Sequence, residues 1–195
     1  MRVLLHICCA VCATAVVESL RRESYQVNGY FYNPNIQPRK EYLRRLESAE
    51  QLARQQKFPL VVGEYDLDEW LLKVQGLENE PEKSGKRCAS CFTLRLEQTA
   101  SFAQEKGFNF FTTTLTVSPH KDAQVINEIG QRVGQGRFLV HDFKKQNGFK
   151  RAQELSRQYG LYHQDYCGCA FSLKEGKDGR IHQAACSFGS KGKTA

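Results

Sequence analysis

Three cysteines, Cys8, Cys9 and Cys12, lie in one short turn directly after the apolar run Arg2–Ile7. That run predicts a buried strand, and the residues from Ala13 onward predict a helix. In an open α/β sheet, ligands bind in the loops at the carboxyl ends of the strands. Thiolates bind soft metals and iron–sulfur clusters, or carry out redox chemistry. The turn therefore indicates a central metal site, with three small buried apolar side chains as the alternative.

A second pair of thiols, Cys88 and Cys91, has the spacing C-x-x-C and is expected at the start of a helix over Cys88–Lys106. There the helix dipole and the free backbone N–H groups stabilise thiolates or the sulfides of a cluster. A lone C-x-x-C is ambiguous between zinc, a cluster and a redox dithiol. Two thiolates from each segment give four ligands, the number that a 4Fe-4S cluster or a structural zinc requires, so metal binding is the stronger interpretation.

A third pair of thiols forms the segment Cys167-Gly168-Cys169. One intervening glycine permits a tight but strained disulfide, and strained disulfides tend to be labile or catalytic. The alternative is that these thiols are further metal ligands. The remaining cysteine, Cys186, is interpreted as a non-essential thiol.

The chain is expected to form one domain, a doubly wound α/β fold with a parallel sheet in the order 3-2-1-4-5. Residues 1–170 are expected to form the catalytic domain, and residues 171–195 a basic tail that is either part of the same domain or loosely ordered. Strands are expected over Arg2–Ile7, Gln26–Tyr32, Leu60–Val62, Phe108–Thr113 and Phe138–His141. Helices are expected over Ala13–Arg22, Arg39–Gln56, Asp68–Val74, Cys88–Lys106, Asp122–Val133 and Phe149–Tyr159. The second of these helices is expected to bury the stripe Leu43, Leu46, Ala49 and Ala53.

Histidines are weaker signals. The strand order brings the expected loop Leu115–His120 opposite the cysteine turn, so His120 is predicted to contact substrate. The others are interpreted as structural: His6, His141 and His163.

The formal charge of +7 favours a polyanionic partner, nucleic acid above all, although a merely basic surface is the alternative. A run of cations on the second helix could contact a phosphate backbone or simply form a solvated face: Arg39, Lys40, Arg44 and Arg45. Cations of the tail could contact phosphate in the same way: Lys174, Lys177, Arg180, Lys191 and Lys193. Four tyrosines are available to stack on a base: Tyr30, Tyr32, Tyr162 and Tyr166.

The chain has no apolar run long enough to span a membrane and no signal peptide, so a cytoplasmic protein is expected. Disulfides are rare in a reducing compartment. The eight cysteines therefore favour metal binding or catalysis.

Several spaced motifs together resemble one family, the QueH-type epoxyqueuosine reductases, over residues 1 to about 172. The motifs are His6-Ile7-Cys8-Cys9-Ala10-Val11-Cys12, Tyr32-Asn33-Pro34-Asn35-Ile36, Cys88-Ala89-Ser90-Cys91, Ser118-Pro119-His120 and Tyr162-His163-Gln164-Asp165-Tyr166-Cys167-Gly168-Cys169. The resemblance implies reduction of epoxyqueuosine to queuosine at the wobble base of certain tRNAs. It also implies a fold similar to the adenine-nucleotide alpha-hydrolases (HUP fold), a 4Fe-4S cluster and a second metal ion, expected to be iron.

The resemblance also implies roles for individual residues. The cluster ligands would be Cys8, Cys9, Cys88 and Cys91, and Cys12 is a candidate ligand of the second metal. Cys167 and Cys169 match a redox-active pair. Apart from the resemblance, the reaction needs a proton donor, and Asp165, Tyr166 or His163 could serve, with Asp165 taken as the catalytic candidate. The substrate-binding residues are expected to be Asn33, Asn35, Arg39, Ser118 and His120. The partners implied are tRNA and an unidentified electron donor, with no membrane.

Two other functions fit parts of this pattern. A non-catalytic, zinc-stabilised tRNA-binding protein would use the same cysteines and the same basic charge. A thiol–disulfide oxidoreductase acting on proteins is the other. Against the latter, the C-x-x-C precedes the fourth expected strand instead of following the first.

Overall fold

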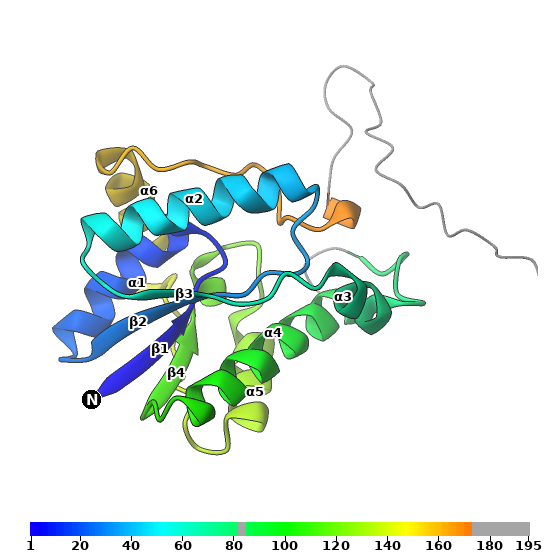
Figure 1. Cartoon of the computed structure of the whole chain (residues 1–195), viewed down its shortest axis with the longest axis horizontal. Coiled ribbons are helices and arrows are strands. Elements are labelled where there is room, and N and C mark those ends of the chain that lie inside the picture. Colours follow the sequence, from blue (N-terminus) through cyan, green and yellow to red (C-terminus); the bar gives the residue numbers. More distant parts are fainter. Residues whose placement is uncertain (82–84, 173–195) are drawn as a thin grey trace, which may run out of the picture.

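The computed structural model describes residues 1–81 and 85–172, so Cys186 and the cations of the tail lie outside the described residues. A parallel sheet of four strands forms its centre (Figure 1). The strands are β1 (Arg2–His6), β2 (Gln26–Phe31), β3 (Leu60–Val62) and β4 (Phe110–Thr113), in the order β3-β2-β1-β4. The predicted α/β class and parallel sheet are confirmed.

Helices flank both faces of the sheet, in two groups that Figure 1 separates clearly. One group contains α1 (Ala10–Arg22), α2 (Arg39–Gln55) and α6 (Gly148–Gln158). The other contains α3 (Leu67–Val74), α4 (Lys86–Glu105) and α5 (Ala123–Gly134). Because it is covered on both faces, the central strand β1 buries Val3, Leu4 and Leu5 completely. None of the helices within the described residues is long and apolar enough to cross a membrane.

The expected fifth strand, Phe138–His141, is wrong. Only Phe138 pairs with the sheet, through an isolated parallel bridge to Phe111 beside β4. The pairing ends there because the side-chain hydroxyl of Thr112 donates to the carbonyl of Leu139 at 3.0 Å, in place of a backbone N–H of the sheet. Beyond that point Val140 is 51% exposed, so its side chain is not part of the core.

The helix α1 begins at Ala10, three residues before its expected start. Its N-cap is Cys9, whose Sγ accepts a hydrogen bond from the backbone N–H of Cys12 at 3.5 Å. Sulfur is not among the usual capping atoms, which is why the residue pattern did not indicate this start. The cap places Cys12 in the first turn of α1.

The buried face of α2 also differs from the prediction. Leu43 is 50% exposed, whereas Tyr42 and Arg45 are buried beside Ala49. The buried face of α2 therefore includes Arg45 and does not include Leu43. The expected loop after β4 begins instead with a short 3-10 helix, η1 (Thr114–Val117).

Candidate metal and redox site

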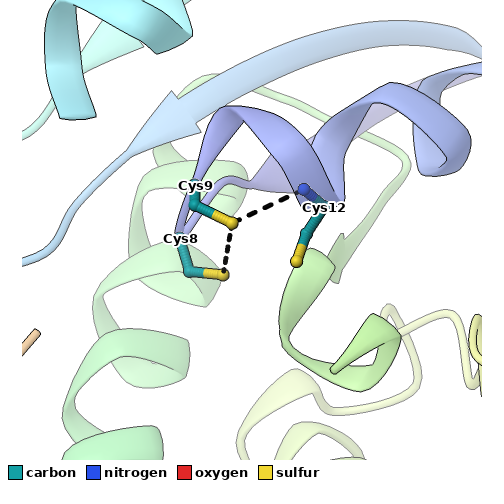
Figure 2. A group of neighbouring side chains, drawn as sticks. All are labelled: Cys8, Cys9 and Cys12. Carbon is teal, nitrogen blue, oxygen red and sulfur yellow. Dashed lines mark hydrogen bonds between the residues drawn. The ribbon is translucent and has the colours of Figure 1, made fainter. Parts of the chain in front are cut away.

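The cysteine turn brings three sulfurs together at the carboxyl end of β1. The Sγ atoms of Cys8, Cys9 and Cys12 all lie within 4.8 Å of one another, and all three residues are buried. Figure 2 shows them at the N-terminal end of α1. The sulfurs of Cys8 and Cys9 are 4.0 Å apart. Thiolates bound to one metal ion at about 2.3 Å lie about 4 Å apart. The spacing and the donor type therefore fit a soft metal ion.

Hydrogen bonds make one thiol of this trio acidic. Hydrogen bonds from Cys12 and Cys9 hold the pKa of Cys8 well below its usual range, and the positive charges of Lys121 and Arg95 act in the same direction. The hydroxyl of Thr114, at the start of η1, also donates to the Cys8 sulfur at 3.2 Å. Cys8 is therefore the most acidic thiol of the trio, and the thiolate is the form that binds metal.

A buried arginine on α4 connects the trio with the other thiols. Arg95 is only 2% exposed, and its Nη1 approaches the Sγ of Cys91 at 3.9 Å. Burial lowers the pKa of Arg95, but negative charge on Cys91, Cys8 and Cys167 outweighs burial and raises it. One guanidinium thus interacts with thiols from all three cysteine motifs.

Lys121 is a second cation of the site. Burial lowers the pKa of Lys121, and negative charge on Cys167, Cys8 and the other thiols of the turn outweighs this and raises it. Neither Lys121 nor Arg95 was predicted from the sequence as a residue of the site. The i, i+4 spacing of Cys91 and Arg95 on one helix face was the available signal, since residues four apart on a helix are neighbours.

The C-x-x-C pair lies on α4, which begins at Lys86 after the N-cap Gly85. Cys88 therefore falls in the first turn and Cys91 in the second, so the helix starts earlier than expected. Cys88 packs against the same core cluster that contains the cysteine turn. Residues three apart share a helix face, so Cys88 and Cys91 can present their sulfurs to one group.

Cys167 and Cys169 are thiols in this structure, with no disulfide between them. Cys169 is buried in a small cluster with Trp70, Leu94 and Cys91. Burial raises the pKa of Cys169 to about 11, so this thiol is protonated at neutral pH. Cys167 is partly exposed and interacts with Arg95 and Lys121. The structure therefore brings the third motif to the first two.

The two predicted substrate-binding asparagines lie in the buried loop after β2. Asn33 donates to the carbonyl of Ile7 at 2.9 Å and accepts from Arg95 at 2.7 Å, so it joins the ends of β1 and β2 to α4. Asn35 is 1% exposed, and its Oδ1 lacks a hydrogen-bond partner among the described residues. A buried amide oxygen of this kind is available to a ligand that can donate a hydrogen bond.

The other predicted substrate-binding residues lie nearer the surface. Arg39 is exposed and stacks over the ring of Tyr65, with 4.4 Å from its Cζ to the ring centroid. The loop after η1 carries Ser118, half-buried, and His120, exposed. Asp165, the predicted proton donor, is also exposed.

His6 is a structural residue, as expected. It is fully buried, with Nδ1 bonded to the hydroxyl of Thr113 at 2.8 Å and Nε2 to the carbonyl of Tyr32 at 3.1 Å. Burial, aided by the positive charge of Arg95, lowers the pKa of His6 to about 3, so it is a neutral structural residue.

The cationic run on α2 requires a correction. Arg45 was expected on a solvated face or at a phosphate, but it is 3% exposed and bonded to protein groups. Arg44 is exposed as expected and lies over the ring of Tyr162 at 3.8 Å.

Comparison with known proteins places the chain in a family. The family model described as "Epoxyqueuosine reductase QueH" matches residues 3–175. A protein of that name from Acinetobacter baylyi is 39% identical over 93% of this chain and 85% of its own length. Those from Streptococcus pyogenes (40% identical, 88% of this chain, 70% of its own length) and Thermotoga maritima (35%, 90% and 92%) also match. The chain belongs to the epoxyqueuosine reductase QueH family.

Proposed function

We propose that this chain reduces epoxyqueuosine to queuosine in tRNA. The observation that carries the proposal is the gathering of thiols from three segments around one buried arginine, Arg95. Family membership supports the substrate, because the relatives are named for this reaction. The formal charge of +7 suits a polyanionic RNA.

The reaction takes an epoxide to an alkene and water, which consumes two electrons and two protons. Oxidation of Cys167 and Cys169 from two thiols to one disulfide releases two electrons and two protons. The pair therefore balances one turnover. An external electron donor then reduces the disulfide and restores both thiols. Asp165, exposed next to Tyr166 in the same segment, is the proposed proton donor to the departing oxygen.

Four thiols are proposed to hold a 4Fe-4S cluster: Cys8, Cys9, Cys88 and Cys91. The fit rests on soft sulfur donors, three of them buried and Cys88 partly buried, with Arg95 and Lys121 available to offset the negative charge of a thiolate-bound group. Cys12, within 4.8 Å of Cys8 and Cys9, is the proposed ligand of a second iron. When bound, such groups supply electrons one at a time and a Lewis acid for an epoxide oxygen.

Substrate contacts are proposed for the predicted polar residues: Asn33, Asn35, Arg39, Ser118 and His120. Asn33 is proposed to act by holding Arg95 and the loop after β2 in position. Asn35 is proposed to offer its buried Oδ1 to the substrate. We further propose that the sheet belongs to the HUP class and that residues 1–170 form one catalytic domain followed by a basic tail. A cytoplasmic location follows from the proposed tRNA substrate.

Metal analysis and turnover of three matched cysteine variants test this function. Cys88→Ala should lose iron, acid-labile sulfide and turnover together. Cys169→Ser should keep the iron but lose multiple turnover. Cys186→Ser removes a thiol that is expected to be non-essential. This variant is the control and should keep its iron and its turnover.

Two results would contradict the proposal. Full turnover by an iron-free Cys88→Ala protein would exclude a cluster at these ligands. Stoichiometric zinc without sulfide in the unsubstituted protein, persisting after reconstitution with iron and sulfide, would favour the zinc-stabilised tRNA-binding alternative.

A further inference from the structure

The segment that carries Cys167 and Cys169 has no helix or strand between residues 160 and 169 to hold it in place. Its position must therefore come from contacts with other elements. The contacts go mainly to α2 and to the loop before it. They centre on Arg45, which was expected at the surface but is buried.

Arg45 uses all three of its guanidinium nitrogens. Its Nε donates to Oε1 of Glu41 at 2.6 Å, one turn earlier on α2. Its Nη1 donates to the carbonyl of Cys167 at 3.0 Å, and its Nη2 to the carbonyl of Tyr166 at 3.1 Å. Because the guanidinium is planar and rigid, fixing Nε on Glu41 also fixes the direction of the other two nitrogens.

Further hydrogen bonds tie the same segment to the same part of the fold. The hydroxyl of Tyr162 donates to Oε2 of Glu41 at 3.0 Å, so the carboxylate that holds Arg45 is itself bonded to the segment. The backbone N–H of Gln37 donates to the carbonyl of Gly168 at 2.7 Å, and the hydroxyl of Tyr166 donates to the carbonyl of Gln37.

Gly168 allows the backbone to come this close to Arg45. Its φ of +122° lies in a region that side chains rarely adopt, and a Cβ there would lie 3.0 Å from Nη1 of Arg45 and 3.1 Å from Cγ1 of Ile36. The positive φ and the close approach to Arg45 and Ile36 therefore both favour a glycine between the two cysteines.

We propose that Arg45 is a positioning residue that holds Cys167 and Cys169 in place through the carbonyls of Tyr166 and Cys167. One end of the held segment places Cys167 near Arg95 and Lys121, and the other buries Cys169 beside Cys91. The link to catalysis rests on the proposed redox role of the two thiols. The positioning itself does not.

Thiol accessibility tests the positioning directly. In metal-loaded, anaerobic protein, alkylation by iodoacetamide is followed at each cysteine by peptide mass spectrometry. Arg45→Met should raise the alkylation rate of Cys169 by about tenfold or more, because two hydrogen bonds no longer oppose local opening. Arg45→Lys keeps the pairing with Glu41 but offers only one donor group, so its rate should be intermediate. Arg54→Met removes an exposed arginine from the same helix and should match the unsubstituted protein.

The conservative variant keeps the test decisive if Arg45→Met does not fold. Circular dichroism identifies such a failure, and Arg45→Lys then carries the measurement. Alkylation of Cys169 at the unsubstituted rate in every folded Arg45 variant would overturn the proposal.

Steady-state kinetics with epoxyqueuosine-containing tRNA separate positioning from RNA contact. The folded Arg45 variants should lose kcat and keep KM, with partial rescue by lysine. A raised KM at unchanged kcat would overturn the proposal, since it would place Arg45 at the RNA. Cys169→Ser distinguishes failure of the redox role. If that variant keeps full multiple turnover, the redox role fails, whereas faster alkylation in the Arg45 variants still supports the positioning.

Discussion

The hydrogen bond between Arg95 and Asn33 gives the sharpest stability prediction. Arg95 Nη2 donates to Asn33 Oδ1 at 2.7 Å, and the two residues are 2% and 1% exposed. Arg95→Met leaves the Asn33 oxygen buried without this donor, and Asn33→Ala leaves the Arg95 nitrogen without its acceptor. Each single substitution therefore removes the same bond, and the double variant removes it only once.

The expected coupling energy follows because the sum of the two single-variant effects counts the Arg95–Asn33 hydrogen bond twice. A hydrogen bond to a charged group contributes about 1.5–3 kcal/mol. The double variant should therefore be less destabilised than the sum of the two single variants by about that amount. The bond from Asn33 to the carbonyl of Ile7 at 2.9 Å cancels from this difference, because Asn33→Ala removes it with or without Arg95.

Urea unfolding of the four proteins, reduced and with metal removed by a chelator, measures the coupling. A parallel cycle that pairs Arg95→Met with Glu105→Gln, an exposed position at the end of α4, is the control and should be additive. Additivity of the Arg95 and Asn33 changes within about 0.5 kcal/mol would refute the reasoning, since independent sites behave in that way.

Three further predictions concern two glycines and the proposed metal. Gly168→Ala should lower the free energy of unfolding by about 1–3 kcal/mol, because its φ is +122° and Arg45 is close; an unchanged urea midpoint would contradict this. Gly130→Ala should cost about 1–3 kcal/mol by overpacking, since its Cβ would lie 2.4 Å from the ring of Phe138; a crystal structure with Phe138 unmoved would contradict it. Removal of metal by a chelator under reducing conditions should lower the Tm, because a ligand that binds only the folded state stabilises it; an identical Tm would show that no metal is held by the fold.

The parts of the fold that depend on apolar periodicity could be predicted from sequence. The four strands and six helices lie close to their expected positions because buried β strands and amphipathic helices have distinct spacings of apolar residues. The fifth strand failed for a local reason: the hydroxyl of Thr112 takes the carbonyl of Leu139. Competition between a side chain and a backbone ladder leaves no trace in hydrophobic periodicity.

The site was only partly accessible to the same reasoning. The spacing of the cysteines indicated three thiol motifs with metal-binding or redox chemistry, because closely spaced cysteines are typical of such sites. Arg45 was expected at the surface and Arg95 was not singled out, because arginines are mostly exposed and only tertiary partners make their burial favourable. Those partners are far away in sequence: Cys167 for Arg45 and Asn33 for Arg95.

The most direct test of the central claim is a turnover measurement on the proposed substrate. Metal-loaded protein with measured iron and sulfide is incubated anaerobically with a reductant and tRNA containing epoxyqueuosine, and the nucleosides are analysed by mass spectrometry. The account predicts conversion to queuosine, with loss of one oxygen atom, that depends on Cys88 and on Cys169. Unchanged epoxyqueuosine in the presence of fully iron- and sulfide-loaded protein would contradict it.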